Sequence, residues 1–248
     1  MTSADQIPTV GAFLPSSRQS EARRHADRDR QREADGRARS EASWPVLDPA
    51  ARYGLAGKVV ELIEPHSEAD PAALLVDFLV AVGSAIGPGP HALAEAAQHP
   101  ARLYAVLVGE TSRGRKGSAR SQIQRVMRAA DPGWSDNGQG GGLASGEGVI
   151  ASVADGEEPV EKRRMFYEPE FARVLGVAAR EGSTLSAVLR DAWDSGTLRV
   201  TTRKEKLVAT GAHVSVMAHI TVEELRRRLP DTEIANGYAN RFLFACVK

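Results

Sequence analysis

A continuous apolar run at Leu103–Val108 is followed by a basic, glycine-rich segment and then by a stretch with helical character. The run reads Leu-Tyr-Ala-Val-Leu-Val, so apolar side chains would point to both faces of an extended chain. This pattern predicts a strand buried on both sides, which is typical of parallel sheets. Parallel strands need long, usually helical, connections between them. The segment therefore predicts an α/β fold with a mainly parallel sheet.

Two helices are expected before this strand. The first covers Leu55–Leu62. The second begins at Asp70 and Pro71, because aspartate suits the N-cap and proline the first helical position, and it stops at Gly87. The second helix is apolar on most sides, which predicts a buried helix. We therefore expect a helical lead-in over residues 44–100.

Residues 101–248 carry the patterns of a three-layer core. The glycine-rich stretch Asp131–Gly142 is expected to form a flexible loop. Thr221 and Glu224 have the spacing of a capping box, which predicts a helix start. Further helices are expected at Ser118–Ala130, Ser145–Ala154, Phe171–Arg180 and Thr184–Trp193, strands at Arg164–Tyr167, His213–His219 and Arg241–Val247, and a hairpin from Thr197–Thr202 and Leu207–Thr210.

Residues 1–43 differ in composition from the rest of the chain. From Arg18 to Glu41 there are eight arginines and six acidic residues, but no Leu, Ile, Val or aromatic residue. Such a segment buries too little apolar surface to offset the entropy lost on ordering. We expect a disordered arm, which is either a plain linker or a tail that contacts nucleic acid.

Charge and cysteine content exclude several classes of protein. The chain has 32 basic and 32 acidic residues, so any contact with nucleic acid must come from a local basic patch. A single cysteine, Cys246, excludes an internal disulfide and a cysteine-based zinc cluster. No apolar run reaches the roughly 18 residues of a membrane span. The polar N-terminus has no signal-peptide pattern. We expect a cytoplasmic protein without membrane contact.

The segment after the first strand has the parts of a phosphate-binding loop. In such loops backbone N–H groups and a helix N-terminus face the anion, a lysine reaches the terminal phosphates, and a hydroxyl binds Mg²⁺. We therefore predict an ATP and Mg²⁺ site here, with Ser118 as the hydroxyl ligand of the metal. The predicted nucleotide-binding residues are Gly109, Thr111, Ser112, Gly114, Lys116, Gly117 and Ser118.

The spacing of this loop departs from the usual G-x4-G-K-[ST] pattern. The sequence reads G-x4-G-R-K-G-S, with Arg115 before the lysine and Gly117 before the serine. Either the loop is one residue longer than usual, or Lys116 is not the phosphate-binding lysine. The alternative interpretation is a basic, glycine-rich surface turn.

Two glutamates follow the strand expected at Arg164–Tyr167. Walker-type ATPases place an acid at the end of a second strand, where it holds Mg²⁺ through water, and a nearby glutamate polarises the attacking water. Glu168 would be the strand-end acid and metal-binding residue. Pro169 ends the strand, so Glu170 would lie on the loop and polarise water. The alternative is a helix N-terminus that carries acids.

Two further residues are candidate catalytic groups. His219 lies at the end of an apolar strand, where a polar side chain can sense the γ-phosphate. Arg241 precedes the last strand and is a candidate arginine finger, which would complete the site of a neighbouring subunit in a ring or filament. The alternatives are a structural histidine and a solvated arginine.

Six sequence blocks between about Tyr53 and Lys248 resemble a family of uncharacterised P-loop proteins from actinobacteria and their mobile elements. This family is related to RepA-like and RecA-type replicative helicases and to primase-linked ATPases. The resemblance implies a RecA-like core, with Gly109–Ser118 as the phosphate loop, Glu168 and Glu170 in the second Walker position, and Arg241 in the finger position. The blocks are LYAVLVGETSRGRKGSA, GGLASGEGVI, RRMFYEPEFARVL, TLSAVLRDAWDSGTLR, ATGAHVSVMAHIT and ANGYANRFLFACVK.

The resemblance implies an ATP-hydrolysing protein that acts on single-stranded or forked DNA in plasmid or phage replication. Two alternatives remain open. One is a replication accessory that binds nucleotide or DNA without turnover. The other is a small-molecule phosphotransferase, because the Lys-Gly-Ser sequence at Lys116–Ser118 resembles the K-G-T of nucleoside monophosphate kinases, although an arginine-bearing lid is not evident.

Overall fold

Five parallel strands form the central sheet of the structure, a computed structural model that describes residues 45–110, 116–201 and 206–248. The spatial order is β4-β5-β8-β3-β9. Every residue of β3 is buried, as its apolar sequence predicts. The predicted α/β class with a parallel sheet is therefore confirmed. The strands are β3 (Tyr104–Gly109), β4 (Gln139–Gly140), β5 (Arg163–Glu168), β8 (His213–Thr221) and β9 (Phe242–Cys246).

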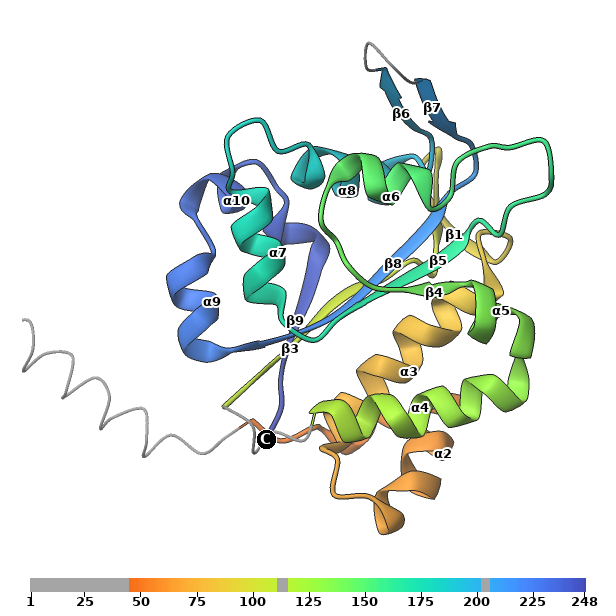
Figure 1. The fold of residues 1–248 in the computed structure, drawn as a ribbon. Helices are drawn as coiled ribbons and strands as arrows, with labels where there is room; N and C mark the ends of the chain where they lie inside the picture. Colours follow the sequence, from red (N-terminus) through yellow and green to blue (C-terminus); the bar gives the residue numbers. More distant parts are fainter. Residues whose placement is uncertain (1–44, 111–115, 202–205) are drawn as a thin grey trace, which may run out of the picture. The chain divides into compact units, whose positions relative to one another are not determined.

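Helices cover both faces of this sheet and make a three-layer structure (Figure 1). Side chains of β3 alternate between the layers: Leu107 joins the core under α3 and α4, whereas Val106 joins the core under α7 and α8. One layer holds α2 (Gly54–Ile63), α3 (Pro71–Ile86), α4 (Lys116–Ala130) and α5 (Pro132–Asn137), and the other holds α6 (Gly146–Ala151), α7 (Phe171–Ala178), α8 (Leu185–Asp194), α9 (Val222–Arg228) and α10 (Asp231–Ala235).

The lead-in before β3 contains the two expected helices and also a hairpin. Asp70 caps α3 by accepting a 2.8 Å hydrogen bond from the backbone N–H of Ala72, and the helix ends at Gly87 with a φ of +73°. The hairpin of β1 (His91–Ala94) and β2 (Ala97–Pro100) was not predicted. Its alanines and polar residues have weak strand propensity, and its side chains are almost all exposed, so no buried face creates an alternating pattern.

The prediction of a flexible loop at Asp131–Gly142 was wrong, because this stretch contains α5 and β4. Asp131 caps α5 by accepting a 2.9 Å hydrogen bond from the backbone N–H of Trp134. The Trp134 side chain is fully buried, and its indole N–H donates a 3.2 Å hydrogen bond to Ser84 on α3. A single buried aromatic residue thus anchors a segment whose glycines suggested mobility.

Other local signals are confirmed. Thr221 and Glu224 form both hydrogen bonds of a capping box at the start of α9. The predicted hairpin is present as β6 (Leu198–Thr201) and β7 (Lys206–Ala209). The arm predicted over residues 1–43 lies outside the described residues. Among the helices of the described ranges, none combines the length and the apolar character needed to cross a bilayer.

Two helical glycines give a matched test of this packing. A Cβ atom on Gly83 of α3 would overlap the backbone oxygen of Ala101, whereas a Cβ atom on Gly176 of α7 would meet no atom within 4 Å. We expect Gly83→Ala to lower the free energy of unfolding by about 1–3 kcal/mol through overpacking. We expect Gly176→Ala to raise it by about 0.5–1 kcal/mol. Urea denaturation of both variants measures the difference, and equal effects would contradict the close approach of α3 to the chain before β3.

Candidate functional site

The strands β3 and β8 are neighbours whose connections leave on opposite faces of the sheet. From the carboxyl end of β3 at Gly109 the chain continues to α4, and from the end of β8 at Thr221 it continues to α9 (Figure 1). Gly109 and Thr221 are paired directly in the register of the two strands. In open α/β sheets ligands bind in the crevice at such a topological switch point, outside the carboxyl ends of the strands. This edge of the sheet is therefore the candidate site.

The two ends of the predicted phosphate loop, which the structure describes, lie at this edge. Gly109 is the last residue of β3, and Lys116 is the first residue of α4. Gly117 and Ser118 lie in the first turn of α4, where both are exposed and no acidic residue occurs. The N-terminus of this helix therefore carries partial positive charge at this edge of the sheet. The other predicted loop residues, Thr111, Ser112 and Gly114, lie outside the described residues.

Glu168 and Glu170 also lie at this edge but in different environments. Glu168 is the last residue of β5, and only 1% of its surface is exposed. Its Oε1 atom accepts a 2.5 Å hydrogen bond from the backbone N–H of Leu143, and its Oε2 atom lies 2.5 Å from a guanidinium nitrogen of Arg173. Glu170 is exposed, precedes α7 and makes no side-chain capping bond. The structure thus separates a fixed, buried carboxylate from a solvated one.

A metal at Glu168 would be held through water, because the carboxylate is almost completely buried. Each carboxylate oxygen has two lone pairs, so each keeps one acceptor position beyond its contact with Leu143 or Arg173. Mg²⁺ typically keeps several waters and takes one or two carboxylates together with substrate phosphates. In the described part of the chain no group of three His, Cys, Asp or Glu side chains gathers around one point. Phosphate oxygens, water and the Ser118 hydroxyl would therefore supply the other ligands.

His219 lies on the opposite face of the sheet from Glu168. It pairs in register with Leu107 of β3, two residues before the end of β8. Its surface is 5% exposed, and its ring packs edge-on against Tyr167 with 5.3 Å between the ring centroids. The structure therefore places His219 near the end of β8, with its ring buried against Tyr167 rather than exposed at the carboxyl edge of the sheet.

Arg241 lies at the opposite edge of the sheet from the glycine loop. It directly precedes β9, whose first residue Phe242 pairs with Tyr104 at the amino end of β3. Its guanidinium donates two hydrogen bonds to Asp194, at 3.2 and 2.6 Å, and a third to the carbonyl of Gly237 at 2.7 Å. The structure does not bring Arg241 to the other predicted residues. The finger role, which acts on a neighbouring subunit, stays a prediction.

Behind the first turn of α4 lies a buried polar network that the sequence analysis missed. Arg120 forms a 3.1 Å ion pair with Asp77 of α3 and donates a hydrogen bond to Gln139 of β4. Its guanidinium also lies 5.1 Å from the centre of the Tyr167 ring. Asp77 is fully buried; burial raises the pKa of its carboxyl, and the neighbouring Arg120 opposes that shift. The network fixes α4 against α3 and the sheet within two turns of Lys116.

One sequence signal points to this network. Asp77 is the only charged residue in α3, an otherwise apolar helix. A charge in a buried helix needs a partner, because an unpaired one costs several kcal/mol. The identity of that partner is not visible in the sequence, since α4 contains four basic residues.

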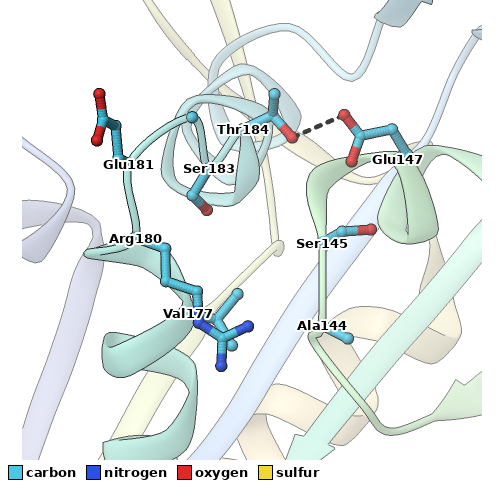
Figure 2. Close-up of a pocket in the computed structure, with 9 residues that line it drawn as sticks. Ala144, Ser145, Glu147, Val177, Arg180, Glu181, Ser183 and Thr184 are labelled. Atoms are coloured by element: carbon cyan, nitrogen blue, oxygen red, sulfur yellow. Dashed lines mark hydrogen bonds between the residues drawn. The ribbon is translucent and has the colours of Figure 1, made fainter.

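A small polar pocket lies between the start of α6 and the chain that joins α7 to α8 (Figure 2). Across it, Thr184 donates a 3.0 Å hydrogen bond to Glu147, which lies in the first turn of α6. Its volume of about 200 Å³ is below the roughly 300–1,000 Å³ of typical ligand pockets. Gly146 allows α6 to approach α8 closely, since a Cβ atom there would lie 2.5 Å from the Thr184 hydroxyl. The geometry therefore indicates a packing role for Glu147.

Comparison of the sequence with known proteins found no matching family model and no similar curated protein.

The buried pair of Asp77 and Arg120 makes a prediction about stability. Asp77→Leu would leave the Arg120 charge buried without its ion-pair partner, so we expect the free energy of unfolding to fall by about 3–5 kcal/mol. The double variant Asp77→Leu/Arg120→Met should recover most of this loss, because it leaves no unpaired charge. Urea denaturation measures both effects.

An exposed ion pair between α4 and α5 provides the control. Arg128 pairs with Asp136 at 2.9 Å, and both side chains are more than 60% exposed. Arg128→Met should change stability by less than about 1 kcal/mol. A double variant at Asp77 and Arg120 that is less stable than the single variant would contradict the interpretation.

Proposed function

We propose that this chain binds ATP at the carboxyl edge of the sheet, between β3 and β8, and hydrolyses it. The observation that carries the proposal is the position of Gly109. This glycine ends a fully buried central strand, lies opposite Thr221 at the switch point, and is joined through the glycine-rich loop to the N-terminus of α4. The glycine-rich loop, a helix N-terminus and a topological switch point thus coincide, which favours a phosphate ligand over the surface-turn interpretation.

A triphosphate fits the spacing of the groups along this edge. Glu168 ends β5, which is separated from β3 by one strand and therefore lies about 10 Å from it. Phosphates that bind the loop after β3 would extend toward β8 and β5. Ser118 and Glu168 would hold Mg²⁺, which neutralises phosphate charge when bound. Lys116 would pair with the terminal phosphates.

The remaining predicted residues have roles that follow from their exposure. Glu170 is solvated and is free of a capping bond, so it is the carboxylate placed to polarise a water molecule at this edge. His219 is buried against Tyr167 and would respond to the phosphates through β8 rather than by direct contact. A five-stranded parallel sheet between helical layers is compatible with a RecA-like core. Action on DNA during replication of a mobile element rests on the sequence resemblance.

A second candidate is nucleotide binding without turnover. The observation that favours it is the displaced lysine, with Arg115 before it and Gly117 after it. Catalysis needs groups held within about 1 Å of the productive geometry, whereas binding tolerates a longer loop. Separate measurements of ATP affinity and ATP turnover distinguish the two candidates.

Nucleotide affinity tests the loop. We expect Lys116→Ala to abolish measurable ATP binding, because the lysine supplies the charge that pairs with the terminal phosphates. Arg115→Ala should weaken binding far less, since this residue is the insertion. Titration calorimetry with MgATP on both variants gives the comparison. An unchanged ATP affinity in Lys116→Ala would reject the assignment of the loop.

Turnover tests the acids and the link to DNA. We expect Glu170→Gln to retain ATP binding but to reduce hydrolysis by about 100-fold or more, because an amide does not polarise water as a carboxylate does. Phosphate release is measured with and without single-stranded DNA, which should stimulate the unaltered protein. Glu181→Gln, at an exposed position beyond α7, is the control and should hydrolyse ATP normally. Full ATP turnover by Glu170→Gln would contradict the catalytic role of Glu170 and favour the alternative, an acid at a helix N-terminus.

A further inference from the structure

Arg173 is a cation at the candidate site that the sequence analysis did not single out. It lies in the first turn of α7, five residues after Glu168 and three after Glu170. Its side chain is 45% exposed, although the Glu168 carboxylate that it contacts is almost completely buried. The guanidinium therefore lies at the boundary between the interior and the solvent at the carboxyl edge of the sheet.

A positive charge at the position of Arg173 does not stabilise the helix that carries it. The first turn of a helix has partial positive charge, so a cation there is disfavoured, and α7 has no acidic residue in this turn to offset it. Within the described residues, the bond to Glu168 is the only hydrogen bond of the Arg173 side chain. A guanidinium has five N–H donors, so four are available to a ligand.

We propose that Arg173 binds the terminal phosphate of the nucleotide, and that Glu168 positions it for this contact. The inference rests on the proposed function and assigns a residue to the phosphate end of that site. Glu168 occupies one nitrogen of the planar guanidinium and fixes its plane, while the remaining donors suit the two-point recognition of a phosphate. The Arg173 guanidinium contacts Glu168 at the end of β5, and β5 is next to β8, about 5 Å away, so the side chain lies close to the switch point.

The contrast with Arg241 supports this assignment within one chain. The Arg241 guanidinium already makes three hydrogen bonds, to Asp194 and Gly237, at the amino edge of the sheet. Arg173 lies at the carboxyl edge with most of its donors available. The structure thus places an available arginine beside the predicted catalytic acids without a second subunit.

The test compares ATP with ADP, because only ATP carries the phosphate that Arg173 is proposed to contact. The unaltered chain, Arg173→Gln and Arg173→Lys are titrated with MgATP and with MgADP by calorimetry. We expect Arg173→Gln to weaken ATP binding by about 10-fold or more and ADP binding by less than about 2-fold. Arg173→Lys keeps the charge but loses the planar fork, so its loss for ATP should be intermediate.

Arg180→Gln is the matched control, since Arg180 follows the same helix and is exposed. It should leave both affinities unchanged. Equal losses for ATP and ADP in Arg173→Gln would mean that the residue only holds Glu168 in place, and this outcome would overturn the inference. If Arg173→Gln binds ATP normally, with the same ratio of ATP to ADP affinity as the unaltered chain, the inference is also overturned. The proposed function would still stand in that case. If the unaltered chain binds neither nucleotide, the proposed function fails first and the inference fails with it.

Discussion

The central strand β3 is hydrogen-bonded on both edges, to β8 and β9, and covered on both faces by apolar residues. A strand of this kind needs helices in both flanking layers, because every residue of Tyr104–Gly109 is buried. The parallel arrangement then brings the carboxyl ends of β3, β5 and β8 to one edge. Gly109 and Glu168 lie at that edge as a consequence of the way the core is covered.

Two buried carboxylates of this core are each paired with an arginine. Asp77 pairs with Arg120 between α3 and α4, and Glu168 accepts hydrogen bonds from Leu143 and Arg173. Buried pairs of this kind rarely add net stability compared with apolar packing, because desolvation offsets most of the attraction. The Glu168 network lies at the carboxyl edge of the sheet, and the Arg120 network fixes α4 against α3.

Local signals predicted most of the fold. The apolar run of β3, the Asp70 cap and the Thr221 capping box each depend on residues close in sequence, and each was confirmed. The helix and strand at Asp131–Gly142 were missed because they depend on a contact between Trp134 and Ser84, which are 50 residues apart. Within the site, the sequence placed Gly109, Ser118 and Glu168 at one edge. It did not reveal the partners of Glu168, since a side chain's hydrogen bonds are set by tertiary packing.

The position of β3 also has a kinetic consequence. Both of its neighbours come late in the chain: Leu107 pairs with His219, and Tyr104 pairs with Phe242. During synthesis this apolar strand therefore has no partner until more than one hundred further residues have been made. Pairings of such high contact order fold slowly, and the waiting strand is prone to aggregation. α3, which precedes β3 and packs on the same sheet, is the element able to shelter it during that interval.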